Sequence, residues 1–170
     1  MLTIRPIHPE EWRDYKRVRL RALQDAPDSF GSTYAAESTR PDEAWASRLK
    51  QAQRSQEDAA LFAEHESTIC GLAWCKIEAD APEVANLYQM WVAPETRGRG
   101  AGSQLLEAAI VWASRTGADV MRLGVTVADS PAMRLYVRRG FAKVGEVEPL
   151  RLGSSIFAQA MELKLSNSAA

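Results

Sequence analysis

Hydrophobic and polar positions alternate along some stretches of the chain and recur at helical spacing along others. The stretch LTIRPI, residues 2–7, alternates and predicts a strand. Residues 10–24 then show helical spacing, and a second helix is expected over 41–53, where Pro and two acidic residues suit a first turn. Residues 25–34, DAPDSFGSTY, have the composition of a loop. The chain therefore begins with one strand followed by two helices.

The middle of the chain is rich in strand patterns. AALFAEHE (59–66) and ICGLAWCKIE (69–78), joined by a short polar turn at Ser67 and Thr68, predict an antiparallel hairpin, and VANLYQMWVA (84–93) predicts another strand. Three strands without an intervening helix exclude a repeating strand-helix-strand organisation in this half.

The second half alternates between helix and strand. Its predicted elements are a helix from Gly102 or Ser103 to about Arg115, a strand over 121–127, a helix opened by Ser130 and Pro131, a strand after Gly140 and Phe141, and a last strand over 155–165. Together the patterns predict an α/β (α+β) fold, a mixed sheet of six or seven strands with helices on both faces.

Composition narrows the class of protein. The 170 residues are 46% hydrophobic and 25% charged, which suits one globular domain over 1–165 with a frayed polar tail at 166–170. The net charge of −1 gives no general attraction to nucleic acid or to a membrane surface. The first residues do not resemble a signal peptide, and the apolar stretch LLEAAIVWA is too short to span a bilayer. We therefore expect a cytoplasmic monomer or homodimer without nucleic-acid or membrane partners.

Cysteine and histidine are too sparse for a metal site. Cys70 and Cys75 lie five apart in one predicted strand, on opposite faces, and match neither a zinc nor a redox motif. His8 and His65 each lack a second ligand at metal spacing. Packed free thiols and no metal are expected.

A glycine-rich turn carries the first chemical signal. In VAPETRGRGAGSQLLEAAI, residues 92–110, glycines at 98, 100 and 102 directly precede a helix. Glycine lets backbone N–H groups approach a ligand closely, and a helix N-terminus adds partial positive charge, so a phosphate is the favoured guest. Arg97 and Arg99 would add forked cationic donors.

The turn matches three common types of glycine-rich turn poorly. A nucleotide-binding P-loop would require GxxxxGK[ST], which does not occur. The dinucleotide fingerprint GxGxxG would require glycine where Ser103 stands and a tighter connection to the preceding strand. A purely structural tight turn would not need three alternating glycines flanked by arginines.

Two ordered motifs carry a family resemblance. Residues 97–102, RGRGAG, fit [RQ]xxGxG, and DSPAMRLYVRRGF, residues 129–141, fits NxxAxxLYxxxGF except that Asp129 replaces asparagine. In this the chain resembles the GNAT superfamily of N-acetyltransferases over about 84–141. Asp129 puts in doubt a side-chain amide bond to the cofactor, although Ser130 and Pro131 still suit a helix start.

The resemblance implies acetyl-coenzyme A (acetyl-CoA) as the cofactor. Its pyrophosphate would lie against the turn, and its pantetheine arm would pair with the backbone of the preceding strand. Asp129 and Tyr136 complete the cofactor contacts that the resemblance implies. The implied residues of the turn and strand are Met90, Trp91, Val92, Arg97, Gly98, Arg99, Gly100, Ala101, Gly102 and Ser103.

Catalytic roles follow from the same resemblance. Tyr136 fits a general acid for the departing thiolate, or alternatively a core anchor whose hydroxyl bonds to the backbone. Glu83, at the entrance to the cofactor strand, is the first candidate for the general base, or else a solvated charge at the strand end. Tyr88 or an ordered-water path is a comparable alternative for the base.

The acceptor pocket is the least specified part. Phe30, Tyr34, Trp74 and Trp91 are candidate walls of the pocket, or core residues. The expected activity is acetyl transfer from acetyl-CoA to a primary amine of a small molecule or peptide by direct attack. The alternative is a non-catalytic module that senses acyl-CoA.

Overall fold

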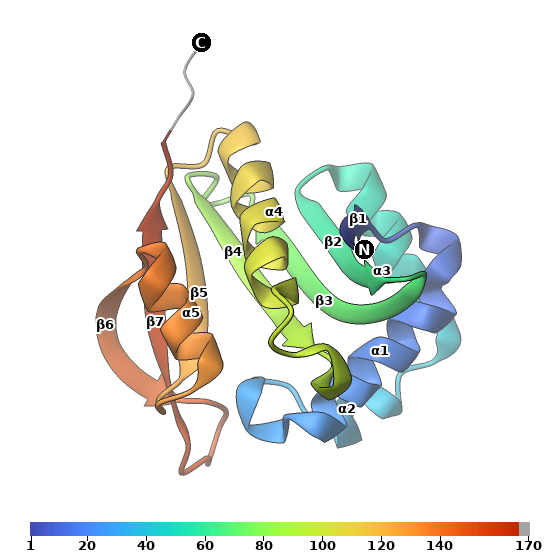
Figure 1. Cartoon of the computed structure of the whole chain (residues 1–170), viewed down its shortest axis with the longest axis horizontal. Helices are drawn as coiled ribbons and strands as arrows, with labels where there is room; N and C mark the ends of the chain where they lie inside the picture. Colours follow the sequence, from blue (N-terminus) through green and yellow to red (C-terminus); the bar gives the residue numbers. More distant parts are fainter. Residues whose placement is uncertain (167–170) are drawn as a thin grey trace.

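The computed structural model describes residues 1–166 and arranges them as seven strands with helices between them (Figure 1). The strands are β1 (Leu2–Pro6), β2 (Asp58–His65), β3 (Thr68–Ile77), β4 (Val84–Val92), β5 (Val120–Thr126), β6 (Ala142–Pro149) and β7 (Phe157–Lys164). The α-helices are α1 (Trp12–Asp25), α2 (Tyr34–Ser38), α3 (Asp42–Ser55), α4 (Ala101–Arg115) and α5 (Pro131–Arg139). Short 3-10 turns are η1 (Pro9–Glu11), η2 (Pro27–Ser29) and η3 (Pro94–Thr96).

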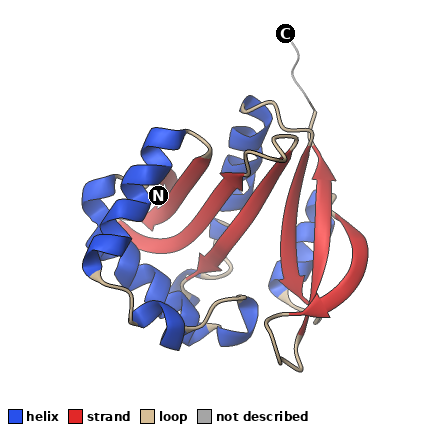
Figure 2. Ribbon diagram, turned by 180° about the vertical axis from the view of Figure 1, so that it is seen from behind, coloured by secondary structure: helices blue, strands red, loops and turns tan. Residues whose placement is uncertain are grey.

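The strands form one sheet in the order β1-β2-β3-β4-β5-β7-β6. All neighbouring pairs are antiparallel except β4 and β5, which are parallel. Helices α1, α2 and α3 cover one face, and α4 and α5 cover the other (Figures 1 and 2). The predicted mixed sheet with helices on both faces is therefore confirmed.

The helices pack through the faces that the sequence pattern predicts. In α1 the buried apolar residues Tyr15, Val18 and Ala22 face the sheet, whereas Trp12, which lies at the same helical spacing, is only partly buried. In α4 the residues from Leu105 to Ala113 that recur at helical spacing are buried. Burial of these stripes on the sheet supplies the main stabilisation of the fold.

Two local details differ from the predictions. The hairpin turn lies at Glu66 and Ser67, one residue earlier than expected, and both have positive φ (50° and 67°), as a two-residue hairpin turn requires. The short helix α2 was not predicted, because five residues are too few to show helical periodicity. Thr33 begins it by accepting a hydrogen bond from the Ala36 amide at 3.1 Å.

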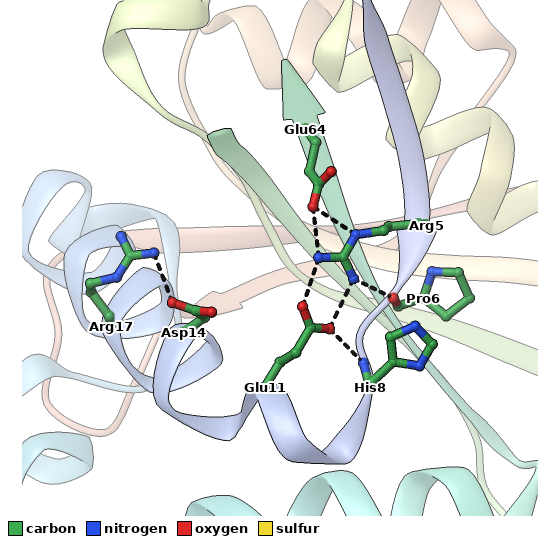
Figure 3. A network of polar contacts seen from close by, with 7 residues as sticks. All are labelled: Arg5, Pro6, His8, Glu11, Asp14, Arg17 and Glu64. Carbon is green, nitrogen blue, oxygen red and sulfur yellow. Dashed lines mark hydrogen bonds and ion pairs between the residues drawn. The ribbon is translucent and has the colours of Figure 1, made fainter. Parts of the chain in front are cut away.

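The N-terminal strand is anchored by Arg5. Its guanidinium donates to Glu64 on β2 at 2.7 Å and to both carboxylate oxygens of Glu11 in η1, at 2.7 and 2.8 Å (Figure 3). Glu11 also accepts from the His8 backbone amide at 2.8 Å. This network ties β1, η1 and β2 together at one edge of the sheet.

Cys70 and Cys75 are both free and buried, as predicted. Within residues 1–166, no group of three or more His, Cys, Asp or Glu side chains is arranged to hold a metal ion. No helix of this part of the chain is long and apolar enough to cross a membrane. The expected frayed tail lies outside the described residues except for Ser166.

The central strands separate partway along their length. The parallel pairing joins Val84–Leu87 to Val120–Leu123 and stops there, although β4 continues to Val92 and β5 to Thr126. Gln89, inside β4, has a left-handed φ of 58°, and the register with β3 shifts between Leu72 and Trp74. The bulge turns β4 away from β5, and the two strands diverge toward their carboxyl ends in both views (Figures 1 and 2).

Candidate active site

The glycine turn lies directly after the diverging end of β4. Gly98 and Gly100 have φ of 81° and 88°, and a side chain added at either would meet no atom within 4 Å. Helix α4 begins at Ala101 with Gly100 as its N-cap, and no side chain caps it. The first N–H groups of a helix have no acceptor within the helix, so those of 101–103 are available to a ligand.

Gly102 has a different role from the other two glycines. A Cβ there would approach Leu135 Cδ2 to 3.4 Å and Val92 Cγ2 to 3.8 Å. The first turn of α4 therefore packs against both β4 and α5, and the space at Gly102 is not open as it is at Gly98 and Gly100.

The two arginines of the turn are not equivalent. The Arg97 guanidinium pairs with Asp25 at 2.6 Å and donates from Nε to the Val92 carbonyl at 3.0 Å. Arg99 is exposed and makes no ion pair with any residue from 1 to 166; it lines a surface hollow of about 300 Å³ near the β2–β3 hairpin. Arg99 is thus the arginine whose charge is available to a phosphate.

A second hollow adjoins the start of α4. It has a volume of about 140 Å³ and lies between α4 and α5, where Arg139 pairs with Glu107. Its lining residues are Ser103, Leu106, Glu107, Leu135, Arg138 and Arg139.

The three predicted residues of the cofactor strand lie on the part of β4 that has left β5. Met90 and Val92 are partly buried. Trp91 is buried, its indole N–H donates to Asp25 at 2.9 Å, and the Arg21 guanidinium lies 5.3 Å from its ring centre. The Trp91 side chain therefore packs toward α1, and its backbone lies opposite Leu72 of β3.

Tyr136 is buried on α5, with 5% of its surface exposed and its ring centre 5.8 Å from that of Phe141. Its hydroxyl makes no hydrogen bond to any residue that the structure describes, so the backbone bond expected for a core anchor is missing. Burial raises the pKa of the hydroxyl, which therefore stays protonated at neutral pH.

Asp129 occupies the position at which the motif has asparagine. Its side chain is exposed and pairs with Arg134 at 2.6 Å. The start of α5 is instead fixed by Ser130, whose hydroxyl accepts a hydrogen bond from the Met133 amide at 3.1 Å, as the sequence predicts for an N-cap.

The structure does not bring Glu83 to the site. Glu83 is exposed, and its carbonyl accepts hydrogen bonds from the amides of Asp119 and Val120, at the end of β4 where the strands are still paired. Met90 lies seven positions further along the chain, at most about 23 Å away at the spacing of an extended strand. This position favours the alternative given for Glu83, a solvated charge at the strand end, over a role as general base.

Tyr88 is closer to the bulge but has the wrong acidity for a base. It is about half exposed, and burial, with the charge of Glu78, raises the pKa of its hydroxyl, which Arg122 only partly offsets. A protonated phenol cannot accept the proton of an amine at neutral pH.

Trp74 is buried, which favours the alternative of a core residue over a pocket wall. It is 3% exposed, packs 5.5 Å from the Tyr15 ring centre, and donates its indole N–H to Asp58 at 2.8 Å. Phe30 is also buried, under the Arg19 guanidinium at 4.8 Å. Of the four predicted wall residues, Tyr34 alone is substantially exposed.

The sequence patterns missed three polar groups near the bulge. Buried Gln89 accepts a hydrogen bond from the Tyr15 hydroxyl at 2.9 Å, and Asp25 binds both Trp91 and Arg97. Arg19 forms a buried ion pair with Glu37 at 2.8 Å. The one available signal was a polar residue at a position where the pattern requires an apolar one, as for Gln89 between Leu87 and Trp91.

Comparisons with known proteins agree with this geometry. The structure superposes on an acetyltransferase of the GNAT family from Streptococcus pneumoniae with a TM-score of 0.84 at 21% identity, covering 98% of this chain and 100% of that one. It also superposes on a putative acetyltransferase from Salmonella typhimurium, solved with its cofactor acetyl-CoA, with a TM-score of 0.80 at 20% identity, covering 100% and 97%. At these identities the likeness establishes the fold.

Sequence relatives are shorter matches. A mycothiol acetyltransferase from Thermobispora bispora is 30% identical over 131 residues, which are 74% of this chain and 41% of the relative. The chain thus spans less than half the length of this curated relative. The model of the acetyltransferase (GNAT) family matches residues 7–141, which include the diverging strands, the glycine turn and Tyr136. The chain belongs to the acetyltransferase (GNAT) family.

Proposed function

We propose that this protein transfers the acetyl group of acetyl-CoA to a primary amine of a small molecule or peptide. The observation that carries the proposal is the separation of β4 from β5 beyond Leu87, directly beside an unobstructed phosphate-binding turn. An extended arm can pair with the unpaired edge of β4 while its phosphates reach the turn.

The residues present fit acetyl-CoA, the cofactor of this family. The amides of 101–103 and the Arg99 side chain would hold the pyrophosphate, and the open surroundings of Gly98 and Gly100 leave room for it. The backbone of Met90 to Val92 would hold the pantetheine arm. Arg138, exposed beside the hollow between α4 and α5, adds a further cationic group along the same side.

Acetyl-CoA supplies a thioester whose carbonyl carbon accepts the amine, so that a C–N bond forms, the C–S bond breaks and the thiolate leaves. The amine must be neutral to attack. For a lysine-like amine only about one molecule in a thousand is neutral near pH 7.4. With Glu83 distant and Tyr88 protonated, we propose that ordered water carries the amine proton away.

Tyr136 would donate a hydrogen bond to the leaving sulfur. An unpaired hydroxyl on α5 is suited to this role. Complete proton transfer from an ordinary tyrosine to a cysteine-like thiolate costs roughly 2 kcal/mol, and the raised pKa of Tyr136 increases that cost. Stabilisation of the sulfur by a hydrogen bond therefore suits Tyr136 better than full protonation early in the reaction.

The acceptor would approach between the loop after α1 and the loop that joins β6 to β7, on the side opposite α4. Arg151 donates to the carbonyls of Pro27 and Phe30 at 2.7 and 3.0 Å, and Thr126 donates to the Asp28 carbonyl at 2.5 Å. These bonds hold the loop after α1 beside the carboxyl end of β5. The relative named a mycothiol acetyltransferase has a small molecule in its name, which supports a small acceptor.

A turnover assay tests the proposal. Purified protein is incubated with acetyl-CoA and a panel of polyamines, amino acids and peptides, and thiol release is measured for the wild type and for Tyr136→Phe. We expect turnover with at least one amine and a loss of about 100-fold in kcat in the variant, because one hydrogen-bond donor to the leaving group is removed. The affinity for acetyl-CoA should change by less than about threefold, since the variant removes no interaction that holds acetyl-CoA equally in the ground state and in the transition state.

Undiminished turnover of Tyr136→Phe would remove the role assigned to Tyr136. Binding of acetyl-CoA without turnover of any amine would favour the sensor alternative.

A further inference from the structure

The last turn of α1 is bound to the segment that leads into the glycine turn by two ion pairs of opposite polarity. Arg21 pairs with Glu95 through two hydrogen bonds of 2.7 and 2.9 Å, and Asp25 pairs with Arg97 at 2.6 Å. The Arg21–Glu95 pair is well exposed, with 43% and 59% of the two side-chain surfaces accessible, whereas the Asp25 side chain is 25% exposed.

Asp25 is more than the partner of one arginine. A single carboxylate oxygen, Oδ2, accepts from the Trp91 indole at 2.9 Å and from Arg97 at 2.6 Å. Burial pushes the pKa of this carboxyl up, but the hydrogen bonds from Trp91 and Arg97 outweigh it and hold the pKa below its ordinary value. Asp25 is therefore charged at neutral pH and joins α1 to β4 and to the turn.

The Arg97 side chain folds back along its own segment. Its Nε donates to the Val92 carbonyl at 3.0 Å, and its Nη2 reaches Asp25. The guanidinium thus closes a ring from the last residue of β4 to the first residue of the RGRGAG motif. This ring spans the point where the chain leaves β4, directly before Gly98 and Gly100.

A carboxylate beside a phosphate-binding turn repels an anionic ligand, so its charge alone would weaken binding. We propose that Asp25 is a positioning residue for the glycine turn: it holds Arg97 against the Val92 carbonyl, so that Arg97 shapes the turn and Arg99 binds the phosphate. This inference rests on the proposed acetyl-CoA site.

Calorimetric titration with desulfo-coenzyme A, which carries the same phosphates without the reactive sulfur, tests the inference. The variants are Asp25→Asn, which keeps an acceptor for Trp91, Arg97→Gln, which keeps a donor for Val92, and the double variant. We expect each single variant to weaken binding on the order of tenfold. The double variant should weaken it by no more than either single variant, because both substitutions break the same interaction between Asp25 and Arg97.

The opposite results follow if Arg97 binds phosphate directly. Asp25→Asn would then release Arg97 and remove a negative charge, and affinity would rise. Arg97→Gln would also weaken binding further in the Asp25→Asn background. Either result overturns the inference.

Two control variants separate positioning from general effects of charge and stability. Glu95→Gln removes a negative charge from the same segment but breaks only the exposed pair with Arg21, so binding should be unchanged or slightly tighter. Arg99→Gln should lower the salt dependence of binding more than Arg97→Gln does, since a direct phosphate contact is the strongest of the screened interactions and the Arg97 charge is paired with Asp25. Equal salt dependences in Arg99→Gln and the wild type would contradict the division of roles.

Failure of the wild type to bind desulfo-coenzyme A would overturn the proposed function together with this inference. Normal binding by the wild type and by Asp25→Asn would overturn the inference alone. Thermal unfolding of each variant identifies any loss of binding that is due to unfolding.

Discussion

Arg19 and Glu37 are charged residues at positions that the fold buries. Their side chains are 5% and 2% exposed, and the Arg19 guanidinium donates to both carboxylate oxygens of Glu37, at 3.2 and 2.8 Å. Nη1 of Arg19 has no hydrogen-bond partner among residues 1–166. Arg40 supplies a second cation to Glu37 at 3.3 Å. The pair joins α1 to α2, and the Arg19 guanidinium stacks on the Phe30 ring, so it supports the loop that borders the proposed acceptor site.

Removal of the carboxylate should destabilise the protein strongly. Glu37→Ala leaves the Arg19 charge buried without a partner, and we expect a loss of about 3–5 kcal/mol in the free energy of unfolding, measured with urea at pH 7. Glu95→Gln, which breaks a solvent-exposed pair, should leave the free energy of unfolding close to that of the wild type in the same measurement.

The loss of stability caused by Glu37→Ala depends on pH. Burial alone would raise the pKa of Glu37, but hydrogen bonds from Arg19 outweigh it, and the folded-state pKa lies below the ordinary 4.5. The stability contributed by the carboxylate is therefore complete above the unfolded-state pKa and is lost as the pH falls through the folded-state pKa. The difference between wild type and Glu37→Ala should shrink below about pH 4; a constant difference down to about pH 2 would contradict this assignment.

At the scale of elements, β4, the glycine turn and α4 form the unit that is expected to hold the cofactor. Gly100 and Gly117 lie at opposite ends of α4 and share a left-handed φ of 88° and 86°, with no atom within 4 Å of an added Cβ. They therefore form a matched pair in which the same substitution introduces the same backbone strain.

Gly100→Asp should abolish binding of coenzyme A, with a loss of more than about 100-fold, because a carboxylate would enter the space assigned to the pyrophosphate. Gly117→Asp should bind like the wild type. Both should lose about 1–2 kcal/mol of stability, since a residue with a Cβ is strained in this conformation. Calorimetric titration and urea unfolding measure the two effects, and normal binding by Gly100→Asp would refute the placement of the pyrophosphate.

The sequence predicted the elements better than it predicted the neighbours of individual side chains. Alternation located β1 to β5 and β7, whereas β6 was expected only from the order of the elements after Gly140 and Phe141. The two motifs located the turn and Tyr136, because these signals are local in the chain. The positions of Asp25 and Gln89 depend on contacts with residues 66 to 74 positions away, which no local pattern encodes. Glu83 illustrates the same limit: its place at the entrance to β4 was correct, but that entrance lies at the paired end of the strand.

At the scale of the whole molecule, the two faces of the sheet have different parts in the proposed reaction. Helices α4 and α5 cover the face that carries the turn, and α1 to α3 cover the face where the loop after α1 approaches β5 (Figures 1 and 2). The two faces of the sheet meet at the gap in pairing between β4 and β5. Asp25 and Trp91 link α1 to this gap, so a change at either face can affect the other.

Calorimetric titration of the wild-type protein with acetyl-CoA, with desulfo-coenzyme A and NAD as controls, tests the cofactor site most directly. We expect saturable binding of both coenzyme A forms at one site per chain and no binding of NAD, because only coenzyme A combines a pyrophosphate with an extended arm that can pair with β4. Absence of binding by both coenzyme A forms, or equal binding of NAD, would contradict the assignment of the glycine turn and the proposed acetyl transfer.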